Sequence, residues 1–379
     1  MNISRSGDDS ALPPDERELL ERARALIPRL AERAPAATAA RQVPPETIAE
    51  FHDAGILRIL QPKMFGGLQG RFSIFSRIVE ELTWGCASSA WVYAVLAEHQ
   101  WIVTGYPEQA QIDVWGDDPL AVVASSLAPR AAATRTAGGW RLSGNYSFSS
   151  GCDYAQWAVL GAFLGEMGDM RHAAYLLVPM HECEIVDDWH VLGLRGTGSK
   201  SLALHNVFVP EHRTLMISDF FAGTVPGAEV HPDYPVVWAP RGFLVSYSLP
   251  PVAIALGGKA LEVATRALSN RVSRGVTRLA QSEIVQMAVG EAGAAIDIAT
   301  HLLHWGRDYS SDMVYAQHQV KWAVDKLCEL CGARWTYDSD PLQEIRRDIE
   351  IILTHHAASR MAAMVPWGQH LLSSAATSP

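Results

Sequence analysis

The stretch from Leu142 to Asp153, Leu-Ser-Gly-Asn-Tyr-Ser-Phe-Ser-Ser-Gly-Cys-Asp, lies in the middle of a zone of short apolar runs separated by glycine turns. Between about residues 120 and 217, β-branched and aromatic residues form runs of strand length, with turns at Gly138-Gly139 and Gly161. Strands are expected over residues 121–125, 140–143, 155–160, 174–178 and 202–209. This zone therefore predicts a β domain of roughly a hundred residues.

Helices are expected on both sides of the β zone. On its N-terminal side, one helix begins at Asp15, a second begins at Pro44-Pro45, and two apolar helices cover residues 72–84 and 88–104. On its C-terminal side, four long and largely apolar helices predict a bundle that is buried further by oligomerisation; they cover residues 249–272, 282–305, 311–333 and 341–372.

The order of these zones predicts the fold class. Most chains that mix helices and strands alternate them, whereas here helices, strands and helices follow in separate blocks. The sequence predicts an α+β fold with four segments: a disordered tail over 1–13, an N-terminal helical domain over 14–118, a central β-barrel-like domain over 119–220 and a C-terminal four-helix bundle over 221–379.

The composition excludes several classes of protein. Hydrophobic residues make up 48% of the chain and charged residues 19%, so the chain can bury a large core. The net charge of −10 argues against a surface that binds nucleic acid. Neither a signal peptide nor an apolar run of ~18 residues is present, and the sequence therefore predicts a cytoplasmic protein without membrane contact.

The five cysteines predict neither a disulfide framework nor a metal site. Cys328 and Cys331 form a single C-x-x-C in a helical segment, and no second pair supplies the four ligands of a zinc site. The sequence also lacks the common phosphate-binding, hydrolase and zinc-protease motifs. Residues 193–199, Gly-Leu-Arg-Gly-Thr-Gly-Ser, lie between two β segments, so a dinucleotide fingerprint is a poor interpretation. This loop is suited to contact a planar ligand or a phosphate.

Three motifs carry a resemblance to a known family. They are Ala-Ser-Ser-Leu-Ala-Pro at 124–129, the stretch 142–153, and the loop 193–199 followed by Val-Phe-Val-Pro at 207–210. With the domain order, they resemble the acyl-CoA dehydrogenase fold, and more closely its branch of two-component flavin-dependent monooxygenases. This branch includes the oxygenase components that hydroxylate 4-hydroxyphenylacetate, steroid-derived phenols and indoles.

The resemblance implies a reaction and its participants. An aromatic substrate, phenolic or indolic, would be hydroxylated with O2 and reduced flavin, FAD or FMN, by way of a C4a-hydroperoxyflavin. A separate NAD(P)H-dependent reductase would supply the flavin, and the oxygenase would form a homotetramer. Two alternatives stay open: oxygenation of nitrogen or sulfur by the same flavin chemistry, and a non-catalytic scaffold that retains the fold.

The resemblance also implies catalytic residues. Dehydrogenases of this fold carry a catalytic glutamate shortly after an Arg-Asp pair, whereas here Arg347-Asp348 is followed by His355-His356. The monooxygenase branch is similar in carrying a histidine there. The role is assigned to His355 rather than to His356, because a shift of one residue on a helix turns the side chain about 100° away. His99 resembles the histidine that meets the substrate, and Ser125 a hydroxyl near the substrate and the peroxide. Which histidine activates the substrate stays open.

The expected flavin site uses hydroxyls, the glycine-rich loop and two arginines. Ser150, with Ser149 beside it, resembles the position at which a hydroxyl bonds to flavin N5. Arg271 and Arg274 resemble helix-end arginines that reach a flavin phosphate from a neighbouring subunit. The full predicted set is Ser126, Ser149, Ser150, Arg195, Thr197, Gly198, Arg271 and Arg274. Each also has a structural interpretation as a turn, a strand end or a solvated charge. Pro129-Arg130-Ala131 departs from the Pro-x-Gly of relatives.

Overall fold

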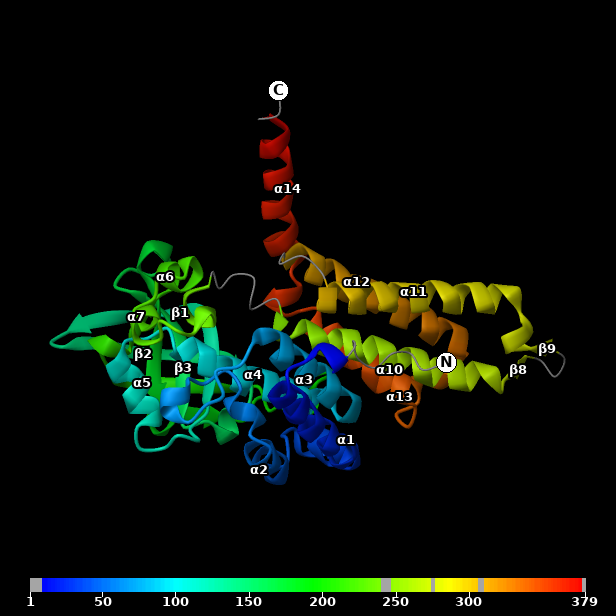
Figure 1. The fold of residues 1–379 in the computed structure, drawn as a ribbon, viewed down its shortest axis with the longest axis horizontal. Coiled ribbons are helices and arrows are strands. Elements are labelled where there is room, and N and C mark those ends of the chain that lie inside the picture. The colour runs from blue at the N-terminus through cyan, green and yellow to red at the C-terminus, as the bar shows by residue number, and fades with distance from the viewer. Residues whose placement is uncertain (1–8, 240–246, 274–276, 306–309, 377–379) are drawn as a thin grey trace. The chain divides into compact units, whose positions relative to one another are not determined.

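The chain folds into two compact units. A computed structural model describes residues 9–239, 247–273, 277–305 and 310–376. The first unit, here called the sheet unit, contains Leu12–Val191 and Arg195–Leu244. The second, here called the bundle unit, contains Met1–Ala11, Leu192–Leu194 and Val245–Pro379. Along the chain, the predicted order of helices, strands and helices is confirmed (Figure 1).

Helices form the N-terminal part of the sheet unit, and their bounds are α1 Pro14–Ala40, α2 Pro45–Asp53, α3 Phe72–Gly85, α4 Ala87–Val103 and α5 Glu108–Trp115. Prolines at the first turns of α1 and α2 start these helices, because a missing N–H costs nothing there. Every residue of α4 is buried, which makes it the central helix of this part. The predicted tail is only partly covered: residues 1–8 lie outside the described residues, and Asp9–Ala11 form a 3-10 turn.

The strands of the sheet unit form one mixed seven-stranded sheet in the order β5-β6-β2-β1-β3-β4-β7. Their bounds are β1 Val123–Thr136, β2 Gly139–Ser149, β3 Trp157–Leu164, β4 Ala173–Pro179, β5 Glu184–Val186, β6 Lys200–Pro210 and β7 Thr214–Met216. The long strand β1 runs parallel to β3 and antiparallel to β2, with a register shift between Ser126 and Ala131. Both halves of the sheet contribute side chains to one core cluster, including Ala124, Leu160 and Leu202.

Three short helices follow the sheet, α6 Ile217–Ala222, α7 Gly227–Val230 and α8 Pro235–Trp238. The bundle unit then consists of α10 Pro250–Ser269, a small hairpin of β8 Val272–Ser273 and β9 Thr277–Arg278, α11 Glu283–Trp305, α12 Ser310–Cys331, α13 Pro341–Ile352 and α14 Arg360–Ala376. Helices α10, α11 and α12 pack against one another lengthwise (Figure 1). Among the described residues, no helix is long and apolar enough to cross a membrane.

The prediction of one continuous helix over 341–372 is wrong. Helix α13 ends at Ile352, and α14 begins at Arg360. Between them, His355 caps the 3-10 turn His356–Ala358, because its Nδ1 accepts a hydrogen bond from the Ala357 N–H at 3.1 Å. His355 therefore lies in a connection between helices and not on a helix.

Candidate functional site

A histidine and a serine form a buried pair between α4 and β1. The Nδ1 atom of His99 lies 2.7 Å from the Val123 carbonyl oxygen, and its Nε2 atom lies 2.9 Å from Ser125 Oγ. A carbonyl only accepts, so Nδ1 carries the ring proton and Nε2 accepts from the Ser125 hydroxyl. Burial lowers the pKa of His99 to about 4, which keeps the imidazole neutral at pH 7. Ser125 thus directs its only proton to His99 and keeps lone pairs for another partner.

A second polar cluster lies where β2 ends. Ser150 Oγ lies 2.6 Å from Ser199 Oγ, and the Trp91 indole N–H donates to Ser150 Oγ at 3.2 Å. Thr197 Oγ1 extends the row, at 2.7 Å from Ser199 Oγ. Gly151, with φ +71°, makes the turn that follows Ser150, and side chains of α4 lie within 3.2 Å of where its Cβ would be. The result is a chain of three hydroxyls against the wall of α4.

Helix α4 carries residues of both clusters. Trp91 and His99 are eight positions apart, which places them about 12 Å apart along the helix axis and about 80° apart around it. Every residue of α4 is buried, so both side chains are held by packing on all sides. The two clusters are thereby fixed to one rigid element.

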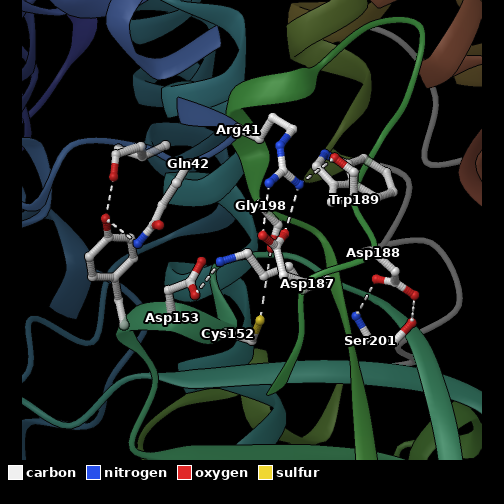
Figure 2. A network of polar contacts seen from close by, with 12 residues as sticks. Arg41, Gln42, Cys152, Asp153, Asp187, Asp188, Trp189, Gly198 and Ser201 are labelled. Atoms are coloured by element: carbon white, nitrogen blue, oxygen red, sulfur yellow. Dashed lines mark hydrogen bonds and ion pairs between the residues drawn. The ribbon is translucent and has the colours of Figure 1, made fainter. Parts of the chain in front are cut away.

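The glycine-rich loop that supplies Thr197 and Ser199 is held by a network of polar contacts (Figure 2). Arg41, the residue that follows α1, binds both carboxylate oxygens of Asp187 at 2.7 and 2.8 Å. Lys200 pairs with Asp153 at 2.7 Å, and the Cys152 thiol donates to the Gly198 carbonyl at 3.8 Å. These contacts fix both sides of the 3-10 turn η7 (Arg195–Thr197) and of the residues that follow it.

Gly198 lies in this loop where its backbone passes close to Asp153 and Arg41. Its φ is +54°, and an added Cβ would lie 3.0 Å from Asp153 Oδ2 and 3.2 Å from the Arg41 carbonyl oxygen. The left-handed backbone and the close approach both favour glycine at this position. The loop is therefore built to bring Thr197 and Ser199 to one place.

The other predicted residues of the sheet unit have varied surroundings. Ser126 Oγ donates to the Ser147 carbonyl at 2.9 Å. Ser149 is fully buried, and its Oγ has no hydrogen-bond partner among the described residues. The same holds for the buried Nε of Arg195. Buried polar atoms without partners are uncommon in folded proteins, and they identify Ser149 and Arg195 as positions suited to a ligand.

The bundle unit holds the remaining predicted residues. The side chain of His355 is exposed in the single chain, and its Nδ1 is occupied by the Ala357 N–H. Arg271 donates from Nη1 to the Cys331 carbonyl. Arg274 lies outside the described residues. Cys328 and Cys331 are buried, and burial raises the pKa of the Cys328 thiol to about 12, in keeping with a packing role.

Sequence reasoning missed three residues that the structure makes prominent. Ser199 is part of the quoted loop motif, but its contact with Ser150 joins residues 49 positions apart. Trp91 is buried in α4, and its indole N–H donates to Ser150 Oγ. Asp348 is buried in α13, where its Oδ1 accepts from the Leu194 N–H at 2.6 Å. Ser199 and Asp348 each left a signal in the sequence, Ser199 in the loop motif 193–199 and Asp348 in the Arg347-Asp348 pair, whereas Trp91 left none.

The residues of the sheet unit fit the flavin that the resemblance implies. A flavin ring is planar and has carbonyl, N–H and nitrogen acceptor groups along one edge. The hydroxyls of Ser149 and Ser150 and the guanidinium of Arg195 offer donors and acceptors for such an edge, and two of these three groups have a buried atom without a partner. Among the described residues, no group of three or more His, Cys, Asp or Glu side chains is arranged to hold a metal ion.

Comparisons with known proteins identify the family. Residues 13–113 match the acyl-CoA dehydrogenase N-terminal domain. The chain is 38% identical to the oxygenase component of an FADH2-dependent resorcinol hydroxylase from Rhizobium sp. strain MTP-10005, over 70% of this chain and 66% of the relative. It is 31% identical to the oxygenase subunit HsaA, a flavin-dependent monooxygenase of Rhodococcus jostii strain RHA1, over 92% of this chain and 97% of the relative.

A solved structure agrees with this relationship. The crystal structure of the 3-HSA hydroxylase from Rhodococcus sp. RHA1 superimposes with a TM-score of 0.85 and 30% identity, over 94% of this chain and 97% of that one. The resemblance inferred from the three motifs is confirmed, as is the acyl-CoA dehydrogenase-like fold. The chain belongs to the family of oxygenase components of flavin-dependent monooxygenases.

Proposed function

We propose that this enzyme hydroxylates an aromatic, electron-rich substrate, phenolic or indolic, with O2 and a reduced flavin that a separate NAD(P)H-dependent reductase supplies. The relatives named as resorcinol hydroxylase and 3-HSA hydroxylase support this substrate class. The observation that carries the proposal is the buried Ser125–His99 pair, because it offers an acceptor for one O–H or N–H group of a substrate.

The flavin is expected to bind along the hydroxyl clusters and the loop. Ser150 would face N5, with Ser149, Ser126, Arg195, Thr197 and Gly198 around the ring, as the resemblance implies. When bound in its reduced form, the flavin supplies the oxygen atom that it activates from O2. The name of the FADH2-dependent relative favours FAD over FMN. Arg271 and Arg274 would reach a phosphate group of the flavin in a neighbouring copy.

The Ser125–His99 pair activates the substrate in this proposal. Ser125 Oγ donates to His99 Nε2, so a lone pair of Oγ accepts the O–H or N–H of the substrate. A hydrogen bond of this kind draws the proton away from the ring and raises the electron density that attacks oxygen. The neutral state of His99 matters, because a protonated imidazole would donate to Ser125 and reverse the bond.

His355 is the second catalytic histidine in this proposal. Because its Nδ1 accepts from the Ala357 N–H, the neutral ring carries its proton on Nε2. Nε2 is therefore the atom that would donate a hydrogen bond to the oxygen that the flavin activates. Between the two histidines, this assigns substrate activation to His99 and proton donation to His355.

A homotetramer is part of the proposal, and the surface of α11 supports assembly. Ile284, Met287, Ile298 and Trp305 are 73%, 60%, 55% and 66% exposed. At 100° per residue, these four side chains fall within an arc of about 60°, so they form a single apolar stripe along the helix. Exposed apolar stripes of this kind mark protein–protein contacts.

The test of the function is an anaerobic titration followed by mixing with oxygen. Reduced FAD and reduced FMN are titrated separately, and the complex is mixed with oxygenated buffer and a panel of phenols and indoles, with amines and thioethers as a second panel. We expect a hydroxylated aromatic product. Products from the second panel alone would establish N- or S-oxygenation instead. A protein that binds neither reduced flavin and consumes no oxygen above a blank would be a scaffold.

A further inference from the structure

The connection between α13 and α14 is held by helix α12. Gln317, a residue of α12 that is 1% exposed, donates from Nε2 to the Ala357 carbonyl at 3.2 Å. The Nε2 atom of the next residue, His318, lies 3.2 Å from the Ala358 carbonyl oxygen. A carbonyl oxygen only accepts, so His318 Nε2 carries a proton and donates it. Two neighbouring side chains of one helix therefore bind two consecutive carbonyls of the turn.

These contacts matter because the turn is short and partly buried. It has three residues, His356–Ala358, and the last of them is 2% exposed. The carbonyls at the C-terminal end of a helical turn have no partner within the turn. A buried carbonyl without a donor costs free energy comparable to a lost hydrogen bond. The place of this turn therefore depends on the donors that α12 supplies.

His355 is tied to the same turn at two points. The Ala357 N–H donates to its Nδ1 at 3.1 Å, and the Ala358 N–H donates to its carbonyl oxygen at 2.9 Å. The peptide group between Ala357 and Ala358 is thereby held by Gln317 on one side and by the His355 backbone on the other. A displacement of this peptide group moves the His355 backbone, and a displacement of the Ala357 N–H turns the His355 ring.

We propose that Gln317 and His318 are positioning residues that hold the His355 imidazole in the orientation from which its Nε2 donates. The inference rests on the proposed function, in which His355 is the proton donor. Such a donor acts only within hydrogen-bond distance of the atom that it serves, and a displacement of about 1 Å can slow a reaction by about a hundredfold. Because His355 lies in a connection and not on a helix, the contacts of this turn set its position.

Gln317→Met tests the first contact. Methionine has nearly the same length and volume but no N–H, so the Ala357 carbonyl loses this donor. We expect hydroxylation in a single turnover to slow about tenfold, while the Kd of reduced flavin changes less than about twofold. The share of O2 released as H2O2 should rise. The Kd is measured by anaerobic titration with reduced FAD or FMN, whichever the parental protein binds more tightly.

His318 offers a loss and a rescue at one position. His318→Phe keeps a planar ring but removes the donor to the Ala358 carbonyl, and should slow hydroxylation as Gln317→Met does. His318→Gln places an amide donor near the position of Nε2 and should restore most of the parental rate. Thr265→Val is the matched control. It removes a hydroxyl that donates to the Leu261 carbonyl at 2.7 Å within α10, and should leave the rate unchanged.

Hydrogen exchange in the flavin-free protein gives a readout that does not depend on activity. The Ala357 N–H is bonded to the His355 ring, so His355→Ala should speed the exchange of this amide directly. Gln317→Met and His318→Phe should speed it about fivefold, the factor that corresponds to one ordinary hydrogen bond. His318→Gln and the control should not. Mass spectrometry of the peptide that contains the turn measures this exchange.

Parental rates and parental exchange in both Gln317→Met and His318→Phe would overturn the inference. A slower rate that His318→Gln does not restore would also overturn it, since packing would then explain the loss. If Gln317→Met does not fold, which thermal unfolding without flavin would show, the two His318 variants decide.

His355→Ala separates the inference from the proposed function. If this variant hydroxylates at the parental rate, His355 is not the proton donor, and both fail. If His355→Ala is slow but the variants of α12 are not, only the inference fails.

Discussion

Ser125 holds a position at which one hydrogen bond decides what the site can bind. Its proton is committed to His99 Nε2 at 2.9 Å, so its oxygen acts as an acceptor. Ser125→Ala should therefore lower kcat/KM for a phenol by roughly tenfold and increase the share of reduced flavin lost as H2O2. Ser125→Thr keeps the hydroxyl and should recover most of the coupling. Product formed per O2 consumed is the measurement, and a parental ratio in Ser125→Ala would exclude the substrate contact.

Asp348 is a residue whose ionisation opposes folding. Burial raises its pKa to about 7, despite the Leu194 N–H that its Oδ1 accepts; nearby Glu344 raises it further, and Arg347 and Lys259 lower it. In the unfolded chain the carboxyl loses its proton near pH 4, so this group destabilises the fold increasingly between about pH 4 and 7 and levels off above. Asp348→Asn keeps an acceptor for Leu194 without the charge.

The gain in Tm of Asp348→Asn over the parental protein should consequently be larger at pH 8 than at pH 5. Thermal unfolding across this range measures it. A gain that is the same at both pH values would show that Asp348 does not titrate as proposed.

At the scale of elements, the loop before η7 and helix α13 fit together through a glycine. A Cβ on Gly193 would lie 2.3 Å from the Arg347 carbonyl oxygen and 2.7 Å from the Asp348 backbone nitrogen. Both are backbone atoms of α13, so neither can move away cheaply, and Gly193→Ala should destabilise the protein by about 1–3 kcal/mol. Gly290→Ala in α11, where nothing lies within 4 Å of the new Cβ, should instead stabilise by about 0.5–1 kcal/mol. Denaturant unfolding compares the two, and a neutral Gly193→Ala would contradict the close packing.

The helices and strands also show how much of the fold the sequence predicts. Helices such as Phe72–Gly85 and Glu283–Trp305 were predicted to within about two residues, because an apolar face at helical spacing is a local signal. Strands β5 and β7 were missed, since each has three residues and depends on a neighbouring strand. The break between α13 and α14 was missed because the His355 ring caps a turn, which periodicity does not reveal.

The candidate site was predictable only in part, because local patterns identify single residues but not their partners from distant parts of the chain. The motifs pointed to Ser150 and Thr197, since each motif is a short stretch of the chain. The partners of Ser150 come from α4 and from the loop before β6, at sequence separations of 59 and 49 residues. Contacts over such distances arise from tertiary packing, so no local pattern in one sequence identifies them.

At the scale of the whole molecule, the proposed tetramer depends on the apolar stripe of α11. Met287 is 60% exposed on this stripe, and a charge there would have to be buried without a partner when copies assemble. Met287→Glu should therefore shift the protein toward smaller species, seen by size-exclusion chromatography with light scattering. Met167→Glu is a matched control, since Met167 is 58% exposed in the sheet unit between β3 and β4. If both variants elute as the parental protein does, the stripe is not an assembly surface, and the copies must meet elsewhere or not at all.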